Sequence, residues 1–115
     1  MINTVLVANR GEIACRILRA CSEAGLTSIA IYAENDAGTL FTELATVSVP
    51  LDGDTIAETY LNQQQILTIA AEHGADAIHP GFGFLSERAD FAQAVIDAGI
   101  NWIGPSPHAL SLIHI

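Results

Sequence analysis

Short apolar runs and helix-like segments alternate along the whole chain. Five runs have the length and composition of β-strands: 4–8, 28–32, 46–50, 75–78 and 101–103. Between them, helical spacing of apolar residues predicts helices over 12–24, 40–45, 62–73 and 88–98. Ser106 and Pro107 are typical of the N-cap and first turn of one more helix. This rhythm predicts an α/β fold, a Rossmann-like parallel sheet with helices on both faces.

The first predicted helix has an apolar face that we expect to pack on the sheet. Its members recur at helical spacing and are Ile13, Ile17, Leu18 and Cys21. Cys15 and Cys21 are separated by about 600° of helical rotation, which places them on different faces. We therefore expect neither a disulfide nor a shared metal ion between them. Gly25 is expected to end the helix in the left-handed conformation.

The segment that follows the run 75–78 is longer than an ordinary strand-to-helix connection, which takes about 2–6 residues. Over 79–87 it reads His-Pro-Gly-Phe-Gly-Phe-Leu-Ser-Glu. Open α/β sheets bind their ligands beyond the carboxyl ends of the strands, which is where this segment lies. The 79–87 loop is therefore the first candidate for a binding site.

Two interpretations of the 79–87 loop stay open at this point. In the structural one, Gly81 and Gly83 only let the chain turn, while Phe82 and Phe84 fill gaps. In the functional one, the glycines let the backbone approach a flat ligand, Phe82 packs on that ligand and Glu87 orients a polar group. Because the loop has no cation, a neutral, amide-like ligand suits it better than a phosphate.

Composition narrows the classes of partner. The chain has 115 residues and a net charge of −9, and half of its residues are apolar, which suits one domain with a core. Four arginines carry all the fixed positive charge, and there is no lysine. So few cations argue against nucleic acid and against an anionic membrane surface. Any nucleotide triphosphate would need cations from elsewhere.

The sequence also bears on location. No run reaches the ~18 apolar residues of a membrane-spanning helix. The N-terminus lacks the basic and apolar regions of a signal peptide. The expected location is therefore the cytoplasm, where the two cysteines would stay reduced.

Three of the four arginines lie within ten positions. Arg10 comes between the first strand and a helix N-terminus, a poor place for a cation, which favours pairing with a carboxylate or an anion. Arg16, Arg19 and Glu23 share one polar stripe of the helix 12–24. The simplest interpretation is an exposed Arg19–Glu23 ion pair of small energy, and the alternative is a partner surface.

Three segments resemble biotin carboxylase, in the same order along the chain. They are Val7–Ala14 (Val-Ala-Asn-Arg-Gly-Glu-Ile-Ala), Ala75–Glu87 (with the 79–87 loop) and Trp102–Pro107 (Trp-Ile-Gly-Pro-Ser-Pro). The similarity is to the N-terminal, pre-ATP-grasp domain of biotin-dependent carboxylases. It predicts a domain over 1–110 and leaves 111–115 as an atypical, truncated end, because the family continues from there to a Met-Gly-Asp-Lys segment whose lysine binds ATP. The ATP-grasp and C-terminal domains are therefore expected to be missing from this sequence.

The resemblance implies an ATP-dependent ligase that carboxylates carrier-bound biotin with bicarbonate through carboxyphosphate, with magnesium accompanying ATP. The partners that it implies are a biotin carboxyl carrier protein and a carboxyltransferase acting on acetyl-CoA, propionyl-CoA, pyruvate or a related acceptor. In this family the ATP-grasp region supplies the catalytic lysines and the metal ligands. We therefore expect no catalytic residue and no metal site within these 115 residues, and no turnover by them alone.

The resemblance also implies roles for individual residues. Phe82 and Gly83, and less directly Glu87, would lie at the mouth of the biotin pocket. Phe82 stands where the family usually has Tyr, so the ring is kept and the hydroxyl is lost. Arg88 stands where Asn is usual and adds a charge beside Glu87.

The charged stripe gains a second implied role. Arg19 and Glu23 match positions of the interface through which family members form homodimers, and Arg16 lies on the same stripe. Two other classes of function stay open: a pre-ATP-grasp domain of another ligase, of the carbamoyl-phosphate type, and a non-catalytic α/β interaction module. The 79–87 loop favours biotin over the first of these, and the second would gain weight only if the open reading frame ended at Ile115.

Overall fold

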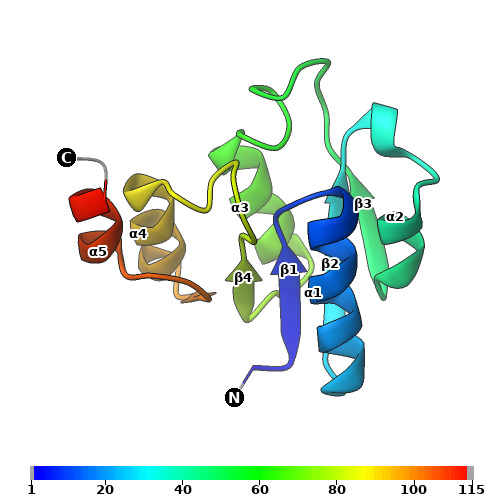
Figure 1. Ribbon diagram of the computed structural model, residues 1–115, viewed down its shortest axis with the longest axis horizontal. Coiled ribbons are helices and arrows are strands. Elements are labelled where there is room, and N and C mark those ends of the chain that lie inside the picture. Colours follow the sequence, from blue (N-terminus) through cyan, green and yellow to red (C-terminus); the bar gives the residue numbers. More distant parts are fainter. Residues whose placement is uncertain (1, 114–115) are drawn as a thin grey trace.

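A computed structural model describes residues 2–113, apart from the side chain of Ile113. Five parallel strands form one sheet in the order β3-β2-β1-β4-β5 (Figure 1). The strands are β1 (Thr4–Val7), β2 (Thr27–Tyr32), β3 (Val47–Pro50), β4 (Ala77–His79) and β5 (Asn101–Trp102). The predicted α/β fold with a parallel sheet is confirmed.

Helices separate consecutive strands, as parallel pairing requires. They are α1 (Gly11–Glu23), α2 (Leu40–Leu44), α3 (Gln63–Glu72), α4 (Ala89–Asp97) and α5 (Pro107–Ile113), with a 3₁₀ turn, η1, at Glu34–Asp36. Gly25 has the expected positive φ of 74° after α1. The Ser106 hydroxyl caps α5 by accepting from the Ala109 N–H at 3.1 Å. Of the end predicted to be atypical, α5 includes 111–113, and 114–115 lie outside the described residues.

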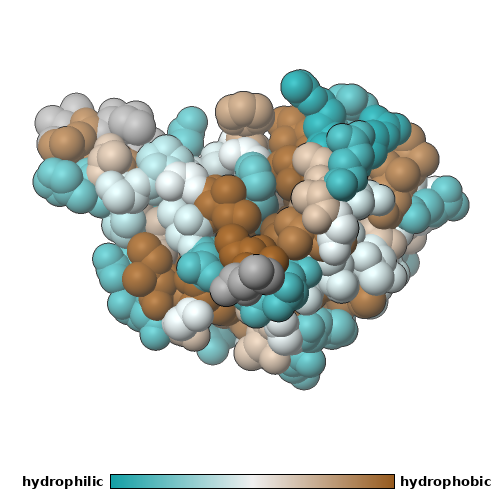
Figure 2. Space-filling model, turned by 90° about the horizontal axis from the view of Figure 1, so that it is seen from below, coloured by the Kyte–Doolittle hydropathy of each residue, from teal (hydrophilic) through white to brown (hydrophobic). Residues whose placement is uncertain are grey.

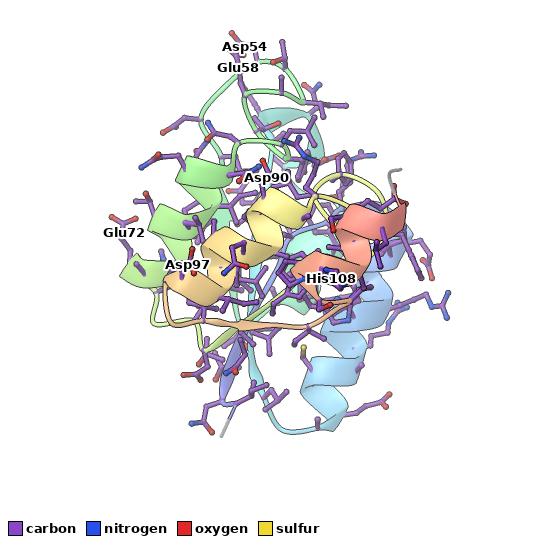
Figure 3. The ribbon with its side chains drawn as sticks, turned by 90° about the vertical axis from the view of Figure 1, so that its left-hand side faces the viewer. Asp54, Glu58, Glu72, Asp90, Asp97 and His108 are labelled. Atoms are coloured by element: carbon purple, nitrogen blue, oxygen red, sulfur yellow. The ribbon has the colours of Figure 1, made fainter. Side chains whose placement is uncertain are left out.

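The face of the sheet under α3 and α4 is fully covered. Leu6, Ile29 and Ile78 point to this side and are almost completely buried, together with Ile66 of α3 and Phe91 of α4. The Phe91 ring meets the ring of Trp102 edge-on, at a centroid distance of 5.7 Å. This face holds the larger part of the core. Glu72 of α3 and Asp97 of α4 are exposed on this layer of helices, and Figure 3 shows Glu72 projecting outward from α3.

The opposite face is covered only in part. Val5, Val7 and Ala30 point to this side and pack under α1 and under Phe41 of α2. Figure 1 shows that α1 lies in front of β2, while β4 and much of β1 are open to the viewer and α5 lies beside α4. Within the described chain, this face therefore has no helix over β4.

The expected inner face of α1 was partly wrong. The buried side chains of the helix are those of Ala14, Cys15, Leu18 and Cys21, while Ile13 and Ile17 are only half-buried. The reason is that α1 is buried both by the sheet and by α2, so its apolar stripe is wide and turned toward β2. For the same reason the two cysteines, expected on different faces, pack into one buried cluster, and both are free thiols.

None of the described helices is both long enough and apolar enough to cross a membrane.

Candidate functional site

The 79–87 loop leaves β4 at the carboxyl edge of the sheet, next to the end of β1. These two strands are neighbours in the sheet although α1, β2, β3 and α3 separate them in sequence. The strand order reverses between β1 and β4, and such a switch point is where open α/β sheets leave a crevice for a ligand. The fold thus places the loop where its sequence context predicted.

Asn9 holds the loop from the end of β1. Its side chain is 1 % exposed, and its amide nitrogen lies 2.7 Å from the Pro80 carbonyl oxygen and 2.6 Å from that of Phe82. Its amide oxygen accepts from the Arg10 N–H at 2.9 Å. A single buried amide therefore links the end of β1 to two backbone carbonyls of the loop.

His79 holds the start of the loop from the end of β4. Its ring is half-buried, and Nδ1 accepts the Gly81 N–H at 3.1 Å. An accepting Nδ1 carries no proton, so the neutral ring fits this contact. Burial lowers the pKa of His79 from its ordinary value, which favours the same neutral form. His79 is thus a packed histidine bonded to the backbone of its own loop.

The two aromatic side chains of the loop have different surroundings. Phe84 packs toward the core, with its ring centroid 5.3 Å from that of Tyr60, although its φ of 47° is unusual for a residue with a side chain. Phe82 is 74 % exposed. The gap-filling interpretation therefore holds for Phe84 and fails for Phe82, whose ring has little packing within the described chain.

The other predicted loop residues, Gly83 and Glu87, are exposed as well. Gly83 is exposed at a φ of 70°, with open space where a Cβ would stand. The turn after it is closed by a 2.9 Å bond from the Ser86 N–H to the Gly83 carbonyl. Glu87 is exposed at the end of the loop. Arg88 next to it pairs with Asp90 at 2.9 Å on the surface.

An apolar groove of about 650 Å³ runs between α1 and the loop. One wall is formed by Ile13, Arg16, Ile17 and Ala20 of α1. The other is formed by His79, Pro80, Gly81, Phe82, Ser86, Ile103, Gly104 and Pro105. Figure 2 shows apolar residues, in brown, gathered in a hollow between the α1 side and the C-terminal side of the molecule. The half-buried isoleucines of α1 and the exposed Phe82 thus belong to one surface.

A buried carboxylate beside the loop ties the two layers of helices together. Asp36 is 4 % exposed and accepts from Arg10 at 2.7 and 2.5 Å and from the Tyr60 hydroxyl at 2.5 Å. The Arg10 guanidinium, ahead of the Tyr60 hydrogen bond, lowers the pKa of Asp36 below its ordinary value. Burial and the neighbouring carboxylate raise the pKa of Tyr60. The predicted pairing of Arg10 is confirmed, with a carboxylate as the partner.

The charged stripe of α1, defined as Arg16, Arg19 and Glu23, is exposed throughout. Among the residues that the structure describes, ion pairs join Arg10 to Asp36 and Arg88 to Asp90, so the simple Arg19–Glu23 pair was wrong. An i, i+4 pair on a solvated helix gains only a few tenths of a kcal/mol, too little to hold two long side chains together. Arg16 connects the stripe to the apolar groove.

Sequence reasoning missed Asn9, Asp36 and Tyr60. Asn9 was only one member of a turn, Asp36 belonged to an acidic turn, and Tyr60 followed a polar segment. The signals for Asn9 were its polar side chain directly after a buried strand and its place in the Val7–Ala14 segment. Within residues 2–113, no three His, Cys, Asp or Glu side chains gather as a metal site would require.

Comparison with known proteins places this geometry in a family. Residues 1–110 match the family model described as biotin carboxylase, N-terminal domain. The chain is 59 % identical to the biotin-dependent acyl-coenzyme A carboxylase alpha3 subunit of Mycobacterium leprae, over 95 % of this chain and 18 % of that protein. It is 46 % identical to the biotin carboxylase of Halalkalibacterium halodurans, over 96 % of this chain and 24 % of that protein.

Solved structures agree with the sequence matches. The biotin carboxylase domain of a thermophilic 2-oxoglutarate carboxylase bound to bicarbonate superposes with a TM-score of 0.96 at 43 % identity, covering 100 % of this chain and 26 % of that one. The chain thus spans about a quarter or less of the length of these proteins. The family model, the relatives and the fold lead to one conclusion: this chain belongs to the family of biotin carboxylase N-terminal domains.

Proposed function

We propose that this chain acts as the N-terminal domain of a biotin carboxylase, the ATP-dependent ligase that carboxylates carrier-bound biotin with bicarbonate. One observation carries the proposal. At the switch point of the sheet, a loop held on both sides presents an exposed Phe82 ring beside a glycine with open space around it. Such a surface suits the flat, neutral ureido ring system of biotin.

Phe82 and Gly83 would contact biotin, and Glu87 would lie at the edge of the same pocket. An aromatic ring gains from covering an apolar bicyclic ligand, and a glycine lets the ligand approach the backbone. No cation lies on the loop itself, since Arg88 begins the next segment and pairs with Asp90. The loop therefore suits the biotin side of the reaction rather than the phosphate side.

ATP and its magnesium would be bound mainly by an ATP-grasp region of the parent enzyme. Two of the four arginines, Arg10 and Arg88, are paired with carboxylates, and there is no lysine. The ATP-grasp region is also the occupant that we propose for the apolar groove. In support, the groove is continuous with Phe82, and the relatives carry at least three quarters of their length outside the matching part.

The remaining partners would be the biotin carboxyl carrier protein and a carboxyltransferase. Both would approach from the side of the loop, because carrier-bound biotin must reach Phe82. The location that we propose is the cytoplasm, which suits two buried free cysteines.

The test of the biotin assignment is Phe82→Ala in a full-length carboxylase that carries this domain. Loss of the ring should raise the KM for biotin about tenfold or more and leave the KM for ATP within twofold. Leu40→Ala is the matched control, because Leu40 is an exposed apolar residue on α2, away from the loop. An unchanged KM for biotin would remove the basis for the assignment.

The isolated 115-residue chain should not turn over. Bicarbonate-dependent ATP hydrolysis, assayed with and without free biotin, measures this directly. Hydrolysis that free biotin stimulates would show that the chain holds a complete active site and would contradict the proposal.

The charged stripe would form part of a homodimer interface in the parent enzyme. Arg16, Arg19 and Glu23 are exposed, and no ion pair joins Arg19 to Glu23. Arg19→Glu should weaken self-association in sedimentation equilibrium, by placing two carboxylates on one stripe. Arg88→Glu reverses a charge elsewhere on the surface and should leave association unchanged. Equal sedimentation of Arg19→Glu and the parent would refute the interface.

A further inference from the structure

The side chain that holds the candidate loop comes from another part of the chain. Asn9 lies 71 positions before Pro80 and 73 positions before Phe82 in the sequence. Its amide nitrogen meets both carbonyl oxygens at 2.7 and 2.6 Å, and its amide oxygen meets the Arg10 N–H at 2.9 Å. These contacts use both amide donors and the acceptor of one buried side chain.

The arrangement is specific to asparagine. A primary amide offers two donors and one acceptor within a small plane, and Asn9 uses all three in fixed directions. An aspartate at this place would have the same shape but would set one carboxylate oxygen, an acceptor without a proton, against both carbonyl oxygens. A serine would reach only one of them.

Gly81 makes the short contacts possible. A Cβ added there would lie 2.7 Å from the Asn9 amide nitrogen and 2.9 Å from Ile13 Cγ2. The loop therefore touches the Asn9 side chain closely, with α1 directly behind it. The position of the loop depends on this contact rather than on the packing of Phe82, which is 74 % exposed.

We propose that Asn9 is a positioning residue for biotin: it fixes the backbone of Phe82 before the ligand arrives and does not touch the ligand itself. This rests on the proposed function of the loop. A ring fixed in advance binds more tightly, because the cost of ordering the loop is not paid on binding. Loss of Asn9 should therefore act on biotin through Phe82 and leave ATP unaffected.

The first test uses the 115-residue chain itself. Asn9→Asp removes both donations, and Asn35→Asp makes the same chemical change at an exposed asparagine. Amide hydrogen exchange should become at least tenfold faster at Gly81 and Ser86 in Asn9→Asp, while amides of β2 keep their rates. Unchanged exchange at Gly81 and Ser86 would overturn the positioning role.

A second variant covers the case in which Asn9→Asp fails to fold. Gly81→Ala keeps Asn9 and displaces its amide through the added Cβ. Gly74→Ala is its control, because its φ of 67° matches the 65° of Gly81 and a Cβ there meets nothing within 4 Å. Faster exchange at Ser86 in Gly81→Ala alone supports the role, and equal exchange in both variants overturns it.

The second test separates this proposal from the function on which it rests. In a full-length carboxylase with this domain, Asn9→Asp should raise the KM for biotin about tenfold and leave the KM for ATP within twofold. Added to Phe82→Ala, it should have no further effect on biotin, since both changes remove the same fixed ring. Additive effects overturn positioning through Phe82. An unchanged KM for biotin in Phe82→Ala alone would refute the proposed function. In that case, the hydrogen-exchange measurement would still show whether Asn9 positions the loop.

Discussion

The two faces of the sheet differ in how completely they are covered. Under α3 and α4, the core is closed, and Phe91 and Ile78 have no exposed surface. Under α1 and α2, the cover stops before β4 and leaves the apolar groove along Ile13 and Ile17. A chain that buries one face and leaves apolar residues open on the other has a surface for a partner. The closed face stabilises the fold, and the open face borders the candidate site.

The largest expected difference between the faces is in side-chain truncation. Phe91→Ala empties a closed site and should lower the free energy of unfolding by about 3–5 kcal/mol. Ile17→Ala in the groove should cost only about 1 kcal/mol, because the side chain is only half-buried. Urea unfolding of both variants, followed by circular dichroism, measures the difference. Equal losses would mean that the groove is packed as tightly as the core.

The next largest effect concerns the junction of the loop with the open face. Gly81→Ala places a Cβ against Asn9 and Ile13 at a positive φ and should cost about 2–4 kcal/mol. Gly74→Ala shares the backbone conformation without the contacts and should cost about 1 kcal/mol. The difference between the two variants in urea unfolding isolates the close approach. Identical midpoints would show that the loop moves away from Asn9 without cost.

Asp36, together with Arg10 and Tyr60, forms a hydrogen-bonded network, the Asp36 network, that links the helices on the two faces of the sheet. Arg10 precedes α1 on one face, and Tyr60 packs in the core under α3 on the other. Asp36→Asn should cost about 2 kcal/mol at pH 7, as expected for hydrogen bonds to a charged group. Asp90→Asn, in an exposed pair, should cost less than about 0.5 kcal/mol. Chemical unfolding of both variants gives the two values. A loss at Asp36 no larger than that at Asp90 would contradict the link.

The same network predicts an acid dependence. Because the pKa of Asp36 is lowered in the folded state, the unfolded state binds its proton first as pH falls. Its stabilisation is therefore present above about pH 4 and is lost as pH falls through the lowered pKa. Asp36→Asn should flatten the stability profile below about pH 4.

The smallest effect is expected at His79. Its pKa is lowered by burial, so below about pH 6.5 the unfolded state takes up a proton that the folded state does not. The stability that neutral His79 contributes is present above about pH 6.5. It falls by less than about 1.4 kcal/mol per pH unit as the pH approaches the lowered pKa. His79→Asn keeps an acceptor for the Gly81 N–H without titrating. Its stability should therefore vary less between pH 5 and 7, and an unchanged slope would exclude His79 as the cause.

Much of the fold follows from patterns that act locally. Gly25 ends α1 and Ser106 caps α5 as predicted, because both effects need only neighbouring backbone. The strands agree within a few residues, and the continuous apolar runs of β1 and β2 are buried on both faces, as such runs predict. The inner face of α1 was partly wrong at Ile13 and Ile17. Periodicity shows that a helix has a wide apolar stripe but not which part of the stripe meets the sheet.

The candidate site divides in the same way. The loop and Phe82 were recognisable from the sequence, because glycines and an aromatic after a strand are an unusual local pattern. The sequence could not predict that Phe82 is exposed while Phe84 packs toward the core, since both are phenylalanines next to a glycine. The Asp36 network was missed because Arg10 and Tyr60 lie 26 and 24 positions from Asp36 in the sequence.

By itself, the sequence determined the order of strands and helices, the place of the loop at a strand end and the lack of cations to hold a phosphate. These follow from local propensity, chain order and composition. The tertiary structure alone decided that Asn9 clamps the loop, that Phe82 stays exposed and that one face of the sheet remains open beside it. Each of these depends on contacts between distant segments, which exist only once the parallel strands have paired.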